Sequence, residues 1–131
     1  MKTDYFLTMN STKTQELTRA ELEIMQILWQ LEKGFVNDIL EAMPTPKPAY
    51  NTVSTIVRIL EKKGFVAHRA YGKSHEYYPL ISRTEYTSSF MTSVVNNFFG
   101  GSIGNMVSFL SRDRVITVSE ADEIIKMLKE K

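Results

Sequence analysis

Apolar residues recur at spacings of three and four over three early segments of the chain, residues 18–33, 36–43 and 49–63. This spacing places the apolar residues on one face of a helix, so the pattern predicts three consecutive helices. Thr18 and Glu21 form a capping box at the start of the first helix, and a proline-rich turn separates the second helix from the third. Two glycines are expected to end the first and third helices, Gly34 and Gly64.

The segment after the third helix has the composition of a β-hairpin. Residues 65–69 and 75–80 are typical of two short strands, and Gly72 supplies the turn between them. Two aromatic residues near the end of the hairpin, Tyr77 and Tyr78, are expected to pack back on the core. Three helices followed by a hairpin is the order of a helix-turn-helix that carries a β-wing.

Residues 82–131 have a different character and are rich in aromatic and aliphatic side chains. Ser82 and Glu85 form a second capping box, two adjacent glycines interrupt the helical pattern, and Ser119 is expected to begin a last amphipathic helix. The chain is thus predicted to be mainly α with a small β-wing. Its predicted parts are a flexible N-terminal tail (1–16), a winged helix-turn-helix DNA-binding domain (17–81) and a C-terminal helical dimerisation region (82–131).

Composition narrows the class of protein. The 131 residues suffice for one compact domain with an appendage, and they contain no cysteine, which excludes a disulfide framework and a thiolate metal site. No segment approaches the roughly 18 consecutive apolar residues of a membrane-spanning helix, and the first residues lack the pattern of a secretory signal. We therefore expect a cytoplasmic protein without membrane insertion.

The third predicted helix has two contrasting faces. The apolar face, expected to lie in the core, consists of Val53, Ile56, Val57 and Leu60. The opposite face carries Asn51, Thr55, Arg58 and Lys62, with Ser54 beside it. In a major groove, asparagine pairs with adenine, arginine pairs with guanine, and threonine bonds to a base or touches a thymine methyl group. The face is either left to water or reads DNA bases, and its neighbours in the sequence favour base reading.

The window around this helix, residues 47–73, is strongly basic and contains a single acid, Glu61, although the net charge of the whole chain is only +1. Cations beside a base-reading helix hold phosphates, whereas a basic hairpin tip without such a helix is usually only solvated. Neither histidine has the partner spacing of a metal site, and no cofactor is expected. The predicted contacts to the DNA backbone are Lys47, Lys62, Lys63, Arg69, Lys73, Ser74 and His75.

The apolar surface of residues 82–131 is more than about fifty residues can bury alone. These helices either fold back on the first domain as one core or meet their copies in a homodimer. A twofold dimer presents two recognition helices to half-sites about one helical turn, or a multiple of it, apart on a palindromic operator. The predicted interface residues are Tyr86, Phe90, Val94, Phe98, Ile103, Val107, Leu110, Ile124 and Leu128.

Several motifs together resemble the penicillinase-repressor family of the BlaI/MecI type. They are "LTRAELEIMQILWQLEKG", "NTVSTIVRILEKKGFV" and "YYPLISRTEY", followed by an aromatic segment that ends in "GG". The resemblance covers roughly residues 17 to 131 and lies in the order and spacing of these motifs. It implies a dimeric winged-helix repressor of β-lactam-resistance or related genes, relieved through a membrane-bound sensor metalloprotease after which the repressor is cleaved.

Carried over by position, the base-contacting section of the family falls on Asn51, Thr52, Ser54 and Thr55. The family's cleaved Asn-Phe pair corresponds here to Ser108-Phe109, so the phenylalanine is kept and the asparagine is replaced. Arg58 stands where several relatives have an uncharged residue, and the chain lacks the Cys-rich tail of a copper-responsive branch. The resemblance therefore implies neither a particular operator sequence nor copper sensing.

Two functional hypotheses from different classes follow. The leading one is a sequence-specific transcriptional repressor that acts as a homodimer on DNA. The alternative is a winged-helix protein-interaction module whose basic window binds an acidic partner, because a fold alone does not settle function. An enzyme is not expected, since no Ser/His/Asp set, Cys nucleophile or phosphate-cradling glycine loop is present.

Overall fold

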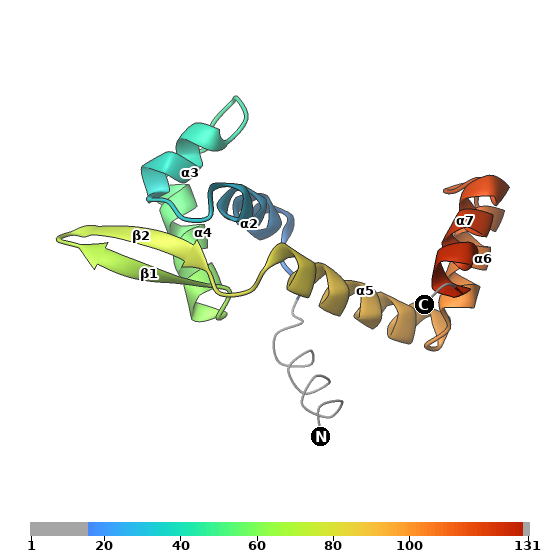
Figure 1. Cartoon of the computed structure of the whole chain (residues 1–131). Helices are drawn as coiled ribbons and strands as arrows, with labels where there is room; N and C mark the ends of the chain where they lie inside the picture. Colours follow the sequence, from blue (N-terminus) through green and yellow to red (C-terminus); the bar gives the residue numbers. More distant parts are fainter. Residues whose placement is uncertain (1–15, 130–131) are drawn as a thin grey trace, which may run out of the picture. The chain divides into compact units, whose positions relative to one another are not determined.

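The structure is a computed structural model that describes residues 16–129, with side chains to residue 127. It is mainly helical with one two-stranded hairpin, which confirms the predicted fold class (Figure 1). The predicted tail, residues 1–16, lies outside the described residues except for Glu16. The elements are α2 (Arg19–Leu31), α3 (Val36–Ala42), α4 (Tyr50–Lys62), β1 (Val66–Tyr71), β2 (Ser74–Pro79), α5 (Arg83–Phe99), α6 (Ile103–Arg112) and α7 (Val118–Lys129).

The chain divides into two compact units within α5, the first ending at Phe90 and the second beginning at Met91. The first contains α2 to α4, the hairpin and the start of α5, and the second contains the rest of α5 with α6 and α7. The sequence placed the corresponding boundary earlier, between residues 81 and 82.

Helix α2 begins at the predicted capping box. The backbone N–H of Thr18 donates to the Glu21 carboxylate (2.9 Å), and the Glu21 N–H donates to the Thr18 hydroxyl (3.1 Å). The prediction that Gly34 ends this helix is wrong. Glu32 ends it in the left-handed region, with φ 72°, and Gly34 instead exchanges two backbone hydrogen bonds with Tyr77 of β2 (2.9 and 2.8 Å).

Helices α3 and α4 form the helix-turn-helix, and Gly64 ends the second of them at φ 88°, as predicted. The turn between them is braced by Lys47, whose ammonium donates to the carbonyls of Leu40, Glu41 and Met43 at 3.2, 2.9 and 2.6 Å. A cation near the last carbonyls of a helix satisfies groups that have no partner within the helix. The core beneath these elements is formed by Leu17, Ile24, Met25, Leu28, Val36, Ile39, Met43, Val53, Val57, Leu60, Phe65, Val66 and Tyr77.

Strands β1 and β2 pair antiparallel, and Gly72 makes the turn with φ 61°, where a residue with a Cβ is strained. Strand β1 ends two residues later than predicted and β2 begins one residue earlier, so only Gly72 and Lys73 lie between them. Tyr77 packs into the core with 4% of its surface exposed, whereas Tyr78 is 38% exposed. The prediction for Tyr78 is wrong because successive residues of a strand face opposite sides.

The start of α5 is tied to the first unit by its aromatic residues. The Tyr86 ring contacts Trp29, Phe65 and Phe90, with centroids 6.0 to 6.1 Å apart, and its hydroxyl accepts a hydrogen bond from the backbone N–H of Leu17 (3.2 Å). Tyr86 therefore belongs to the periphery of this core. The predicted capping box of Ser82 and Glu85 is present, with bonds of 2.8 and 3.0 Å.

In the second unit, α6 and α7 pack together and bury Val107 and Ala121. Helix α7 begins at Val118, one residue before the predicted Ser119. Thr117, not Ser119, forms its capping box with Glu120, with bonds of 2.9 and 3.0 Å. Both serine and threonine can cap, but only Thr117 has a glutamate three residues later in the sequence.

No helix in the described part of the chain is long and apolar enough to cross a membrane.

Candidate nucleic-acid interface

Helix α4 presents an exposed polar face opposite its core face. Val53, Val57 and Leu60 are completely buried. The predicted outward residues are all exposed: Asn51, Thr52, Thr55, Arg58 and Lys62. The helix therefore holds small amide and hydroxyl groups, and one guanidinium, away from the rest of the first unit.

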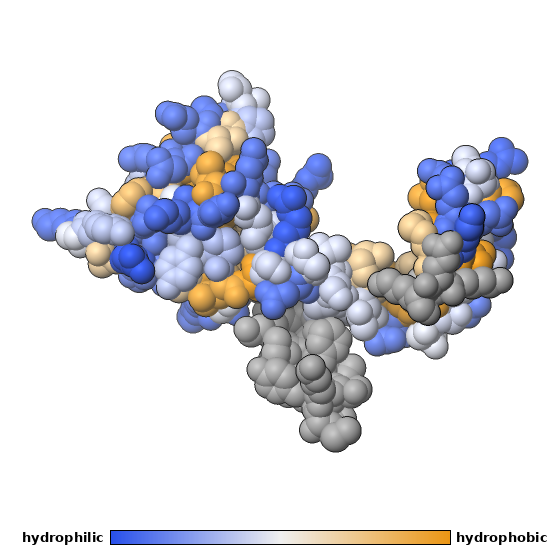
Figure 2. Space-filling model, viewed as in Figure 1, coloured by the Kyte–Doolittle hydropathy of each residue, from blue (hydrophilic) through white to orange (hydrophobic). Residues whose placement is uncertain are grey.

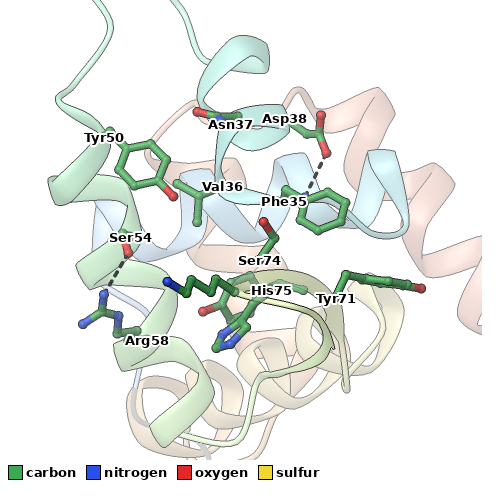
Figure 3. Close-up of a pocket in the computed structure, with 12 residues that line it drawn as sticks. Phe35, Val36, Asn37, Asp38, Tyr50, Ser54, Arg58, Tyr71, Ser74 and His75 are labelled. Atoms are coloured by element: carbon green, nitrogen blue, oxygen red, sulfur yellow. Dashed lines mark hydrogen bonds between the residues drawn. The ribbon is translucent and has the colours of Figure 1, made fainter.

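Ser54 lies at the edge between these two faces and is only 9% exposed. Its hydroxyl accepts a hydrogen bond from Nη2 of Arg58, one helical turn later, at 3.4 Å (Figure 3). Ser54 was predicted to contact a base, but it has little surface to offer to one. What the structure shows is a serine that supports the arginine on the exposed face.

A cleft of about 660 Å³ separates α4 from the hairpin, with residues around the start of α3 closing its far side (Figure 3). It brings together five of the residues predicted to contact DNA, namely Ser54, Arg58, Lys73, Ser74 and His75. The lining thus combines two cations, two hydroxyl groups and an imidazole. Its acidic member, Asp38, has one carboxylate oxygen occupied by the backbone N–H of Phe35 (2.9 Å).

The register of the hairpin divides the wing residues between its two faces. His68 pairs with Tyr77, and Ala70 with His75, so these four residues share one face of the hairpin. Arg69 is opposite Glu76 on the other face and does not line the cleft. The predicted cluster of wing residues is therefore divided, with Arg69 on the outer face and next to an acid.

Two of the predicted phosphate contacts have ammonium groups that are already bonded to other groups of the protein. Lys47 is bonded to three carbonyl oxygens at the end of α3. Lys63 forms an ion pair with the buried Glu21, at 2.9 Å. Lys47, Lys62 and Lys73 are all exposed, so Lys47 differs from the other two in its hydrogen bonds and not in its burial. The sequence shows that a lysine lies near the helix but not which groups its ammonium contacts. Sequence reasoning therefore could not tell the two bonded lysines from Lys62 and Lys73.

Sequence reasoning missed several residues that line the cleft. Tyr50, at the first position of α4, is 48% exposed, and Asn37 lies exposed in the first turn of α3. Tyr71, near the hairpin tip, is also exposed and contacts the Phe35 ring at 5.9 Å. An aromatic residue at the first turn of an otherwise polar helix face was a signal for Tyr50. No local pattern places Phe35 beside Tyr71, because this contact depends on the tertiary fold.

One titratable group that lines the cleft, the buried Tyr77, has a shifted pKa. Burial raises the pKa of the Tyr77 hydroxyl, the nearby charge of Glu61 raises it further, and the charge of Arg58 opposes this. Tyr77 therefore stays neutral and serves as a packing residue. Within the described residues, no group of His, Asp and Glu side chains is arranged to hold a metal ion.

The residues predicted to form a dimer interface fall into different environments. Tyr86 packs on the core of the first unit, where Phe90 stacks on it. Val107 is buried within the second unit, and Val94, Leu110 and Ile124 are half-buried. Phe98 is 75% exposed and Ile103 43% exposed. The side chain of Leu128 lies outside the described residues.

The predicted cleavage site lies inside a helix. Ser108 and Phe109 are in the middle of α6, and both are exposed. The Phe109 ring contacts Phe99 with centroids 5.5 Å apart. The peptide bond between Ser108 and Phe109 therefore lies near the surface, but it is held in helical conformation.

The helix-turn-helix, the hairpin beside it and the exposed polar face of α4 define a winged-helix protein. The chain belongs to the penicillinase repressor family, whose pattern matches residues 17–130. This is a family of transcriptional repressors with winged-helix DNA binding, and it is non-enzymatic. Membership confirms the family resemblance seen in the sequence and the expectation that the chain is not an enzyme.

Individual relatives match most of the chain. The penicillinase repressor of Bacillus licheniformis is 29% identical over 120 residues, which cover 90% of this chain and 93% of the relative. The methicillin resistance regulatory protein MecI of Staphylococcus aureus (strain N315) is 26% identical over 120 residues, covering 91% and 98%. A solution structure of the DNA binding domain of the repressor BlaI is similar with a TM-score of 0.48 and 28% identity, covering 54% of this chain and 88% of that one.

Proposed function

We propose that this chain is a sequence-specific transcriptional repressor that binds a palindromic operator as a homodimer. The observation that carries the proposal is the exposed face of α4, where Asn51, Thr55 and Arg58 stand clear of the core. Membership of the penicillinase repressor family supports it. The genes controlled are those of β-lactam resistance or related functions, as the names of the relatives suggest.

The chemistry of the α4 face fits the major groove of DNA. An amide such as that of Asn51 pairs with adenine through two hydrogen bonds, and a guanidinium such as that of Arg58 pairs with guanine. Thr52 and Thr55 offer hydroxyl and methyl groups to neighbouring base edges. The small size of these side chains lets the helix backbone approach the floor of the groove.

The cleft beside α4 fits the sugar-phosphate strand that borders this groove. Arg58 lines the cleft on the side of α4, and Ser74 and His75 line it on the side of the wing (Figure 3), where Lys73 adds a cation. Groups on both sides of one strand fix the register of the helix, while base contacts give the sequence preference. Lys62, exposed at the end of α4, adds a further cation for phosphate.

The second unit supplies the surface for a homodimer. Large apolar side chains are exposed on it, including Phe98, Ile103, Phe109, Val115, Val118 and Met127. Figure 2 shows hydrophobic residues reaching the surface around α6 and α7. A monomeric protein rarely exposes so much apolar surface, and a twofold contact with the same surface of another copy covers it. Of the predicted interface residues, Phe98 and Ile103 are best placed for this role.

Release from DNA by proteolysis is a further part of the proposal. A membrane-bound sensor metalloprotease is the expected origin of the signal, and the bond between Ser108 and Phe109 is the expected site. Because that bond lies within α6, a protease gains access only when the helix opens locally. After exposure of cells that contain the sensor to inducer, we expect a fragment ending at Ser108. An intact chain released from DNA would contradict this route.

One experiment tests the central proposal. The purified chain selects bound duplexes from a random pool, and the selected sequences are aligned. We expect a palindromic consensus with half-sites about one helical turn, or a multiple of it, apart. The alternative function, binding of an acidic protein partner by the basic residues of the wing and α4, predicts no enrichment and negligible binding to random duplex even at low salt.

A further inference from the structure

Two histidines of the wing form a stacked pair. His68 of β1 and His75 of β2 lie on the same face of the hairpin, diagonal to each other in the strand register. Their rings are 4.0 Å apart between centroids and inclined by only 6°. At this separation, two positively charged imidazolium rings repel each other by about 1 kcal/mol in water, and by more where the protein shields them from water.

One member of the pair is held by an acid. Nδ1 of His68 lies 2.6 Å from a carboxylate oxygen of Glu61, in the last turn of α4. A carboxylate only accepts hydrogen bonds, so Nδ1 carries the proton in this contact. The bond is strongest when His68 is charged, because it then joins opposite charges. The contact links the wing to α4.

The other member of the pair faces the cleft. His75 is exposed and lines the cleft with Arg58 and Lys73 (Figure 3). The remaining titratable groups that border the cleft and the stack are Asp38 from α3, Tyr50 and Glu61 from α4, and Tyr71 and Tyr77 from the hairpin. None of these offers His75 a carboxylate of the kind that His68 has in Glu61. A phosphate placed in the cleft would provide that negative charge.

We propose that DNA binding by this chain takes up a proton at His75, and that Glu61 and His68 are positioning residues that control this uptake. In this proposal, a charge on His68, which the Glu61 carboxylate favours, disfavours a second charge on His75 before DNA arrives. A DNA phosphate in the cleft overcomes this repulsion, so His75 gains a proton as the complex forms. The inference deepens the proposed function, on which it depends, by making affinity increase as the pH falls.

Histidine is the side chain that ordinarily changes charge between about pH 5 and 8. Within this range, uptake of one proton per subunit makes the affinity change by up to about tenfold per pH unit for each subunit. No other interface residue of the wing or α4 titrates ordinarily in this range. The chain's two histidines are thus the pair that can make binding depend on pH near neutrality.

The test measures the affinity of the full chain for a labelled duplex of the selected consensus, from about pH 6 to 8 at fixed ionic strength. For the wild type, we expect Kd to rise with pH with the slope given above. His75→Gln should flatten this dependence. Lys73→Gln is the matched control, since it removes a cation from the same turn but no titrating group, and should weaken binding at every pH with the slope unchanged.

Two variants test the positioning residues. His68→Gln removes the neighbouring charge, and Glu61→Gln removes the carboxylate that retains it. In both, His75 should take up its proton more readily, so the pH range over which affinity changes should move upward. Circular dichroism shows whether each variant is folded, so that a loss of structure can be distinguished from a shift of the pH range.

The outcomes separate the two proposals. If the wild type binds the consensus duplex with the same affinity at all pH values, or if His75→Gln keeps the wild-type slope, this inference is overturned while the proposed function stands. An unmoved pH range in both His68→Gln and Glu61→Gln overturns the positioning roles. No duplex binding at any pH overturns the proposed function and this inference with it.

Discussion

Lys63, directly after the recognition helix, forms an ion pair with Glu21 of α2 at 2.9 Å. Both oxygens of the Glu21 carboxylate accept from Lys63 Nζ, and one of them also caps the start of α2 through Thr18. Glu21 is almost completely buried. A single carboxylate thus connects the beginning of α2 to the end of α4, and Lys63 stabilises the domain from within.

Removal of this carboxylate should destabilise the first unit. Glu21→Gln removes the negative charge that pairs with the Lys63 ammonium and leaves one oxygen to accept from Lys63 and Thr18, for an expected loss of about 1–3 kcal/mol in the free energy of unfolding. Glu23→Gln is the matched control, because Glu23 is exposed on the same helix. Urea unfolding followed by circular dichroism measures both. Equal stability of the two variants would show that the ion pair contributes little.

The same contact makes stability depend on pH. Burial raises the pKa of the Glu21 carboxyl, but hydrogen bonds from Thr18 and Lys63 and the charge of Lys63 outweigh it, so the pKa lies below its ordinary value of 4.5. Because the folded-state pKa is below the unfolded one, the stabilisation is complete above the unfolded value and is lost as the pH falls through the folded value. The stability difference between wild type and Glu21→Gln should therefore shrink below about pH 4. Thermal melts at decreasing pH would contradict this if the difference stayed constant.

Features that depend only on residues close together in the chain could be predicted from the sequence. The capping boxes of Thr18 and Ser82 and the helical periods formed as predicted, since each is made within one turn of chain. The outward face of α4 was also predicted correctly, because the helical period alone separates it from the core face. Local pattern thus predicted the helix that carries the proposed base contacts.

Features that join distant residues could not be predicted. The bridge between Gly34 and Tyr77 and the ion pair between Glu21 and Lys63 each span more than forty positions of the chain. Whether Lys63 remains available to DNA depends on such a contact. Tyr86 is similar: its place among aromatic residues of the first unit follows from the path of α5, which no short pattern gives.

Loss of the Asn51 amide should relax sequence preference at one base pair of each half-site. Asn51→Ala is expected to reduce discrimination there by about 1–3 kcal/mol, with little change in affinity for random duplex. Gln30→Ala removes an exposed amide from α2 and serves as the control. Binding of consensus duplexes with single base changes measures the effect. Equal losses on consensus and random duplexes would argue against a base contact.

Lys73 and Lys47 should differ in their contribution to the salt dependence of DNA binding. Lys73 is exposed on the wing turn and lines the cleft, so Lys73→Ala should weaken binding to all sequences and reduce the salt slope by about one unit. Lys47→Ala removes a similar charge, but that charge is bonded to carbonyl oxygens of the protein. Its main effect should be lower stability. Titrations at several salt concentrations compare the two, and a larger change of slope for Lys47→Ala would contradict the assignment.

Phe98 provides the sharpest test of the dimer. It is the most exposed of the predicted interface residues that the structure describes, so its replacement does little to the fold of the second unit. A charge within an apolar contact costs desolvation, so Phe98→Asp should weaken self-association at least about tenfold.

The control for this change is Asn97→Asp, which adds the same charge at the preceding, exposed position and removes only an amide that donates to Ser93, not apolar surface. Analytical ultracentrifugation measures the dissociation constants of both variants and the wild type. Because the two half-sites of a palindrome are held by linked subunits, Phe98→Asp should also lose most of its preference for a palindromic over a half-site duplex. A variant that remains dimeric places the self-association surface elsewhere on the chain.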